Sequence, residues 1–147
     1  MHEELCRKIR EYYSQKSYCD FTVGKAQKWI NMALKYACIY DEEDAEALKQ
    51  VFRFCHVPVD RYIADSIVNR LGVALPAYSG FQMPSVRPFR AEKSNYSWSR
   101  IDNYEAYLNC QTQIKTALRI KSPSLCALEW EYSEWLAAKS EKEIQQG

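Results

Sequence analysis

The sequence predicts an all-α fold, a single compact domain of about six helices with one long irregular loop. Apolar residues recur at helical spacing along most of the chain. Only four glycines occur among 147 residues, too few for the many tight turns of an all-β domain. The length suits one domain that buries a core. We expect residues 1–140 to form it and residues 141–147 to be a polar tail.

Four helices are expected in the first half of the chain. Apolar periodicity places the first over about 3–15 and the second over about 25–40. The acidic run "DEEDAE" begins a third, about 41–54, because acidic side chains suit the positive end of a helix. A fourth, about 59–71, is predicted to end at Gly72, a typical helix stop.

The second half begins with the irregular loop, residues 73–98, which contains three prolines among aromatic and basic side chains. A loop of this length inside a compact domain is either functional or partly mobile. Its aromatic and basic side chains indicate either a packed surface strap, the simpler interpretation, or a nucleic-acid groove. A helix over about 101–120 follows. Ser122 as cap and Pro123 at the first helical position predict the start of a last, amphipathic helix. Its glutamates are interpreted as a solvated face: Glu129, Glu131 and Glu134.

Composition excludes several classes of protein. No run of 18 apolar residues is present, so no membrane span is predicted. The N-terminus is polar and acidic, unlike a signal peptide, and we expect a cytoplasmic protein. The six cysteines are scattered without a C-x-x-C pair, so they are expected to be reduced and buried. With only His2 and His56 as histidines, neither a metal site nor a cofactor is predicted, and His56 is interpreted as a structural hydrogen-bond partner.

The second predicted helix is apolar around most of its circumference, which places it in the middle of the domain. Its polar residues share a wedge roughly 100° wide. Two lysines on such a helix should reach solvent, a carboxylate or a cleft, and a wet face with extended lysines is the simplest interpretation. The wedge consists of Gln27, Lys28, Asn31, Lys35 and Cys38.

Asp60 stands at the start of the fourth predicted helix, in "VPVDRYIADSIVNRLGV". Aspartate is a favoured N-cap, because its carboxylate accepts the unpaired amide hydrogens of the first turn. It can also be a catalytic carboxylate. The two roles are compatible, since a capping aspartate can still point toward a cleft.

Together, "FTVGKAQKWINMALKYA" and "VPVDRYIADSIVNRLGV" resemble the helix-hairpin-helix DNA glycosylase superfamily over about residues 21–73. A glycine-containing turn leads into a helix with a lysine, and an apolar residue followed by aspartate opens a second helix that ends in "NRLG". The spacing from Lys28 to Asp60 is closest to the archaeal 8-oxoguanine glycosylase branch. Gly24 alone stands where the family has Gly-x-Gly. The chain also resembles small uncharacterised bacterial helical proteins.

The resemblance implies a nucleic-acid-directed, DNA repair protein that acts as a glycosylase and lyase on a damaged, flipped base. Lys28 would attack the sugar and form a Schiff base, and Asp60 would stabilise the positive sugar or help to activate the lysine. The implied phosphate-binding residues are Gly24, Lys25, Arg87, Arg90 and Lys93. The candidates for stacking on the base are Trp29, Phe81 and Trp98.

The alternative function is a non-catalytic helical module that binds a protein partner, such as a small accessory or inhibitor protein of a mobile element. Under this interpretation, the polar wedge of the second helix is the partner surface, with Gln27, Asn31 and Lys35 as its contact residues. The net charge of +1 favours neither alternative.

Overall fold

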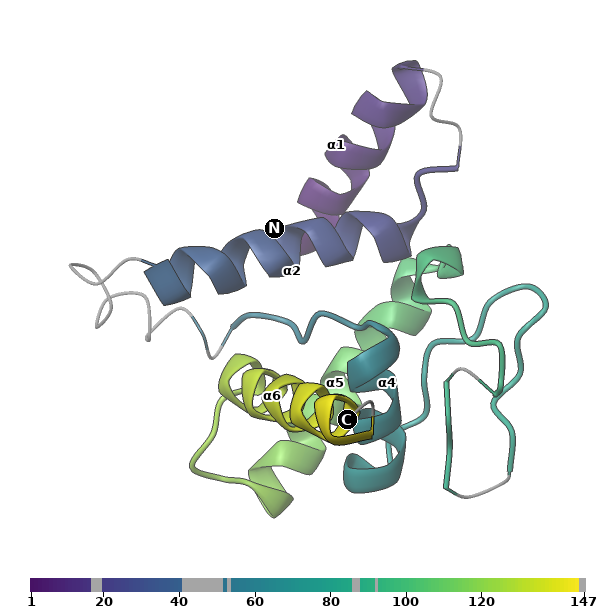
Figure 1. The fold of residues 1–147 in the computed structure, drawn as a ribbon. Helices are drawn as coiled ribbons and strands as arrows, with labels where there is room; N and C mark the ends of the chain where they lie inside the picture. The colour runs from purple at the N-terminus through teal and green to yellow at the C-terminus, as the bar shows by residue number, and fades with distance from the viewer. Residues whose placement is uncertain (17–19, 41–51, 53, 86–87, 92, 146–147) are drawn as a thin grey trace.

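The computed structural model describes residues 1–16, 20–40, 52, 54–85, 88–91 and 93–145. These residues form five α-helices, with one π-helical turn and one 3-10 turn, and no strand (Figure 1). The all-α prediction is therefore confirmed. The expected helix over 41–54 falls almost wholly outside the described residues. The helices are α1 (His2–Gln15), α2 (Val23–Tyr40), α4 (Arg61–Ser66), α5 (Tyr104–Lys121) and α6 (Ala127–Gln145).

Helix α2 lies across the molecule, with α1 packed on one side and the remaining helices on the other (Figure 1). It begins at a threonine cap, since the Thr22 hydroxyl accepts the Lys25 amide hydrogen at 3.2 Å. The first turn touches the 3-10 turn η2 (Trp98–Arg100), and the Gly24 amide donates to the Ile101 carbonyl at 2.8 Å. A Cβ on Gly24 would lie 1.9 Å from the Trp98 carbonyl oxygen, so only glycine fits at this crossing.

An extended segment, residues 55–60, runs beneath α2 and leads into α4 (Figure 1). All six of its residues are buried. Helix α4 is short because the chain changes at Ile67 to a π-helical turn, η1 (Ile67–Leu71). Gly72 ends this turn with a φ of 76°, in the left-handed region that glycine tolerates. The predicted stop at Gly72 is confirmed.

The predicted loop forms a strap that packs on the core through four aromatic side chains, with exposed residues between them. Its aromatic residues Tyr78, Phe81, Phe89 and Tyr96 are all buried. The side-chain amide of Asn69 holds it from η1, donating to the Phe89 carbonyl and accepting the Phe89 amide hydrogen, each at 2.8 Å. Such pairing satisfies the backbone of a segment that has no secondary structure of its own.

Helix α6 begins at Ala127, four residues after the predicted start at Pro123. Ser122 instead ends α5, where its amide bonds to the Leu118 carbonyl at 2.8 Å. The Glu129 carboxylate reaches back to the Cys126 amide at 2.8 Å, which is half of a capping box and fixes the later start. Helix α6 continues to Gln145, so most of the expected tail has a helical backbone.

The main core lies among α4, η1, α5, α6 and the strap, with Tyr107, Ile63 and Phe89 among its largest buried side chains. A second, smaller cluster of Cys6, Ala26 and Ile30 joins α1 to α2. Tyr104 packs against both clusters and connects them. In the described part of the chain, no helix combines the length and apolarity needed to span a bilayer.

Candidate functional site

The structure brings Lys28 and Asp60 into direct contact. Lys28 lies on the second turn of α2, and its Nζ donates to Asp60 Oδ2 at 2.5 Å. The side chains are 18% and 12% exposed, so the pair is at the edge of the core with limited access to solvent. The Trp98 ring lies beside it, with its centroid 5.9 Å from Lys28 Nζ. A charged amine, a carboxylate and an indole thus meet at one place.

Asp60 also caps α4, as predicted. Its Oδ1 accepts the amide hydrogens of Tyr62 at 2.9 Å and Ile63 at 3.0 Å, and its backbone is extended, as an N-cap requires. The two oxygens therefore have separate partners, the helix start at Oδ1 and Lys28 at Oδ2. Three charge-assisted bonds fix the orientation of this carboxylate.

The polar wedge of α2 faces inward, not toward solvent. Gln27 and Asn31 have no exposed surface, and the Gln27 amide donates to the Val59 carbonyl of the extended segment at 3.3 Å. Asn31 Nδ2 donates to Gln27 Oε1 at 3.0 Å. The interpretation of the wedge as a wet face is wrong. The inward direction of the wedge makes Gln27, Asn31 and Lys35 inaccessible to a protein partner, because their polar groups bond to the buried backbone, to one another and to a buried carboxylate.

His56 is a structural hydrogen-bond partner, as expected. Asn31 Nδ2 donates to the Tyr107 hydroxyl oxygen at 2.9 Å, and the same hydroxyl is hydrogen-bonded to His56 Nδ1 at 3.0 Å. Burial, the nearby His2 and Lys115 lower the pKa of His56 to about 3. His2 lies against it with ring centroids 4.3 Å apart, and burial lowers its pKa too. Two neutral imidazoles therefore join α1 to the core.

Gln111 on α5 is a structural residue that the sequence pattern did not single out. Its Oε1 accepts the Val57 amide hydrogen at 2.9 Å, and its Nε2 donates to the Val57 carbonyl at 2.8 Å. Together with Gln27, which bonds to the Val59 carbonyl, Gln111 satisfies backbone groups of a buried extended segment. This arrangement positions Asp60 at the end of that segment.

A second ion pair joins the other end of the wedge to α6. Lys35 Nζ lies 2.7 Å from Glu131 Oε2, and the two side chains are 6% and 1% exposed. The prediction that Glu131 and Glu134 lie on a solvated face is wrong, since both are buried, whereas Glu129 is exposed. Their positions follow the apolar stripe, because Glu131 lies three residues after Leu128 and four before Trp135. This spacing was the sequence signal that could have indicated that Glu131 is buried.

Gly24 does not offer its amide to a phosphate in the way that the resemblance implies. The Gly24 amide is already bonded to Ile101, and its missing side chain makes room for the Trp98 carbonyl. Lys25 Nζ donates to the Asp20 carbonyl at 2.8 Å. Of the two residues, only Lys25 has a group that can turn to an outside ligand.

Of the other implied phosphate-binding residues, the structure describes two, Arg90 and Lys93. Arg90 is exposed and lies 3.6 Å from the carboxylate of Asp65, Lys93 is exposed, and Arg87 falls outside the described residues. Phe81 is buried between Tyr78 and Tyr96, which corrects its assignment as a stacking residue.

Of the other two stacking candidates, Trp29 is 55% exposed, on the side of α2 that meets Tyr13 and Phe21. Trp98 is half-buried and is the candidate that lies beside Lys28. The described contacts therefore associate one of the three proposed aromatic residues with the Lys28–Asp60 pair.

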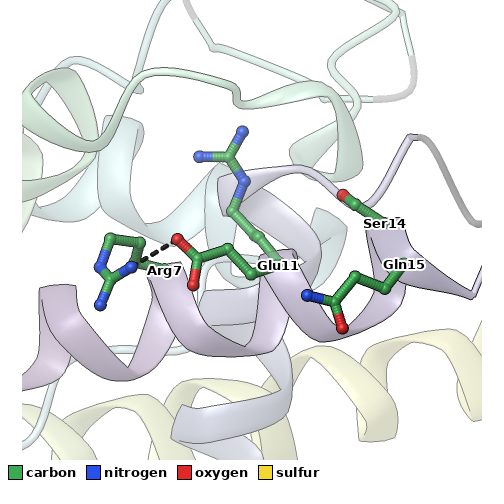
Figure 2. A pocket seen from close by; sticks show the side chains of 5 residues that line it. Arg7, Glu11, Ser14 and Gln15 are labelled. Carbon is green, nitrogen blue, oxygen red and sulfur yellow. Dashed lines mark hydrogen bonds and ion pairs between the residues drawn. The ribbon is translucent and has the colours of Figure 1, made fainter.

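A shallow hollow of about 420 Å³ lies on the outer face of α1, between Arg7, Arg10, Glu11, Ser14 and Gln15 (Figure 2). Arg7 pairs there with Glu4 and Glu11, so its charge is already compensated. Among the described residues, no group of three or more metal-ligand side chains comes together. These features add no chemistry to the site.

The cysteines that the structure describes with side chains are not joined in disulfides: Cys6, Cys55, Cys110 and Cys126. Burial raises the pKa of Cys110 to about 12 and that of Cys6 to about 11. Such thiols are poor nucleophiles, because the thiolate is the reactive form. Cys19 and the side chain of Cys38 fall outside the described residues.

No protein-family model matches this chain, and neither a curated protein nor a solved structure matches it.

Proposed function

We propose that the chain is a nucleic-acid-directed protein of the glycosylase and lyase type, with Lys28 as its amine nucleophile and Asp60 as its carboxylate. The observation that carries the proposal is the 2.5 Å contact between Lys28 Nζ and Asp60 Oδ2, beside the Trp98 ring. The resemblance over residues 21–73 motivates the choice of substrate class.

The proposed chemistry uses both members of the pair. The Lys28 ammonium must lose a proton before its nitrogen can attack, and Asp60 Oδ2 is placed to accept that proton. At an abasic sugar, the free amine adds to the C1′ carbonyl carbon, water leaves, and an imine remains. In glycosidic bond cleavage, the Asp60 carboxylate would stabilise the positive charge that develops on the sugar.

Borohydride trapping tests this proposal. Borohydride reduces an imine to a stable secondary amine, so the parent chain incubated with an abasic duplex should give a covalent, gel-shifted species. Lys28→Ala should abolish that species. Lys8→Ala is the control for the loss of a lysine, because Lys8 is exposed on α1 and belongs to none of the proposed catalytic or phosphate-binding residues. A parent chain that gives no adduct, or a Lys28→Ala chain that gives an equal one, refutes the proposed function.

The second candidate is a helical module that binds a protein partner through a surface other than the polar wedge. Exposed aromatic side chains on α1 and α2 favour it, since Tyr12 and Trp29 are each more than half exposed. Under this candidate, Trp29→Ser should weaken capture of a partner, while Leu108→Ser on the exposed face of α5 should not. Equal capture by both variants would remove this surface from consideration.

A further inference from the structure

The Lys35–Glu131 pair is the most deeply buried ion pair among the described residues. Lys35 Nζ lies 5.3 Å from the centroids of both the Tyr132 and Trp135 rings, which favour a cation at that point. Glu131 Oε1 has no hydrogen-bond partner in the described structure, and Oε2 lies 2.7 Å from Lys35 Nζ. The pair is therefore a close contact between opposite charges.

This pair lies on the same stripe of α2 as the pair proposed for catalysis. Lys35 follows Lys28 by seven residues, two helical turns, which separates them by about 10.5 Å along the axis. Their carboxylate partners also belong to neighbouring elements, because Asp60 caps α4 and α4 packs against α6, which contains Glu131. Two lysine–carboxylate pairs thus lie along the same side of α2, where it meets the start of α4 and α6.

We propose that Glu131 is a positioning residue for the Lys28–Asp60 pair: it neutralises Lys35, so that the charge of the Lys28 amine depends on Asp60 and not on a second buried cation. The role of Glu131 in catalysis rests on the proposed function, whereas the electrostatic coupling between the two pairs is independent of that function. The charged groups that act on the Glu131 carboxylate are Lys35, which contacts it, Lys28 on the same helix, and Asp60 at the start of α4. On its own helix, the nearest carboxylate, Glu134, is paired with Arg70 of η1.

The direction of the pKa shift of Glu131 and its causes agree with a coupling between the two ion pairs. Its pKa is raised, first by burial, while the hydrogen bond from Lys35 and the charges of Lys35 and Lys28 oppose the rise and the Asp60 carboxylate adds to it. A group that responds to both members of the other pair must also act on them, because electrostatic coupling is reciprocal.

Glu131→Gln tests the proposal, because it keeps the shape of the side chain and leaves the Lys35 cation uncompensated. Repulsion at this separation should lower the pH at which half of the Lys28 amine is uncharged by about one unit. The readout is the pH titration of the lysine ¹³Cε and ¹⁵Nζ signals, with Lys28 assigned from a Lys28→Arg chain. Adding Lys35→Met to Glu131→Gln removes the orphaned cation and should return the Lys28 midpoint to within a few tenths of a unit of the parent.

A purely structural role for Glu131 does not predict that recovery. An unchanged Lys28 midpoint in a folded Glu131→Gln chain, or a shift that Lys35→Met does not reverse, overturns the proposal. If Glu131→Gln does not fold, a titration of the parent chain tests the coupling instead. The carboxyl ¹³C signal of Glu131 should then titrate in more than one step, and a single-step curve for Glu131 refutes the coupling.

The titration also separates this inference from the proposed function, since it needs no substrate. If the parent gives no trapped adduct but the Lys28 midpoint shifts and recovers, the function fails and the coupling stands. If trapping succeeds, its pH profile should shift downward in Glu131→Gln by the same amount as the Lys28 midpoint. Trapping with an unshifted midpoint rejects Glu131 as a positioning residue and retains Lys28 as nucleophile.

Discussion

Asp60 uses each carboxylate oxygen for a different partner, so its charge and its capping ability can be separated by substitution. Asp60→Asn keeps an oxygen that can accept the Tyr62 and Ile63 amide hydrogens, but it removes the negative charge opposite Lys28. We expect a loss of about 1–3 kcal/mol in the free energy of unfolding, from the weakened charge-assisted bond to a largely buried ammonium. Urea denaturation measures this loss.

Asp60→Ala removes the cap as well and should cost more than Asp60→Asn, by about another 1 kcal/mol. Asp102→Asn is the matched control, since Asp102 is exposed and should change stability by less than about 0.5 kcal/mol. Equal losses for Asp60→Asn and Asp60→Ala would show that the cap contributes nothing. An Asp60→Asn chain with the same free energy of unfolding as the parent would show that the ion pair contributes nothing to stability.

At the scale of elements, Gly24 determines how closely α2 crosses the 3-10 turn η2. A Cβ there would meet the Trp98 carbonyl oxygen at 1.9 Å and Ile101 Cβ at 3.3 Å, so Gly24→Ala forces backbone to move. We expect a loss of about 1–3 kcal/mol in the free energy of unfolding, as for other overpacked sites. Amide hydrogen exchange should also rise in η2, which contains Trp98.

Gly72→Ala provides the comparison for this prediction. The nearest heavy atom to a Cβ at Gly72 is Lys121 Nζ at 4.0 Å, so this change meets open space and only the positive φ is strained. It should cost about 1 kcal/mol and leave exchange in η2 unchanged. A Gly24→Ala chain as stable as the parent would mean that the close crossing does not constrain α2.

Local sequence patterns predicted where the helices begin and end better than they predicted how the helices pack together. Apolar periodicity placed α1, α2 and α5 close to their observed ranges, and the aspartate cap and glycine stop around α4 are local signals. The start of α6 was missed because it depends on the Glu129 side chain reaching back to Cys126, which overrides Ser-Pro as a start signal.

The inward direction of the α2 wedge was also missed, for a non-local reason. Gln27 is buried because it bonds to the Val59 carbonyl, and the helical pattern of α2 contains no information about that partner. The contact of Lys28 with Asp60 was anticipated through the resemblance, whereas the Lys35–Glu131 pair was not, because the α6 glutamates were assigned to solvent. Side-chain pairing across distant segments therefore limited the prediction of the candidate site.

At the scale of the whole molecule, α2 is attached to the remaining helices by buried polar groups as much as by apolar contacts. Two ion pairs link it to Asp60 and to α6, and side-chain amides link it to the buried segment beneath it. The neutral His2 and His56 rings continue this network to α1 through Asn31 and Tyr107. Stability should therefore depend on the protonation state of the network.

Acid should destabilise the fold through His56. Its pKa is about 3 in the fold and 6.5 unperturbed, so below pH 6.5 the unfolded chain binds a proton that the folded chain does not. The stabilisation is complete above about pH 6.5 and is lost as the pH falls toward 3. Between pH 7 and pH 5 the loss should be about 2 kcal/mol. The lowered pKa of His2 acts in the same direction.

Urea denaturation at a series of pH values measures this dependence, and His56→Asn isolates it from other groups. Glu131, whose pKa is raised, gives a dependence of opposite sign that both chains share, so the difference between the parent and His56→Asn belongs to His56. The parent should lose more stability than His56→Asn between pH 7 and pH 5, although His56→Asn is less stable at pH 7 because its contact with Tyr107 is altered. Parallel curves for the two chains over this range would refute the assignment, because they would mean that His56 takes up its proton as readily in the fold as in the unfolded chain.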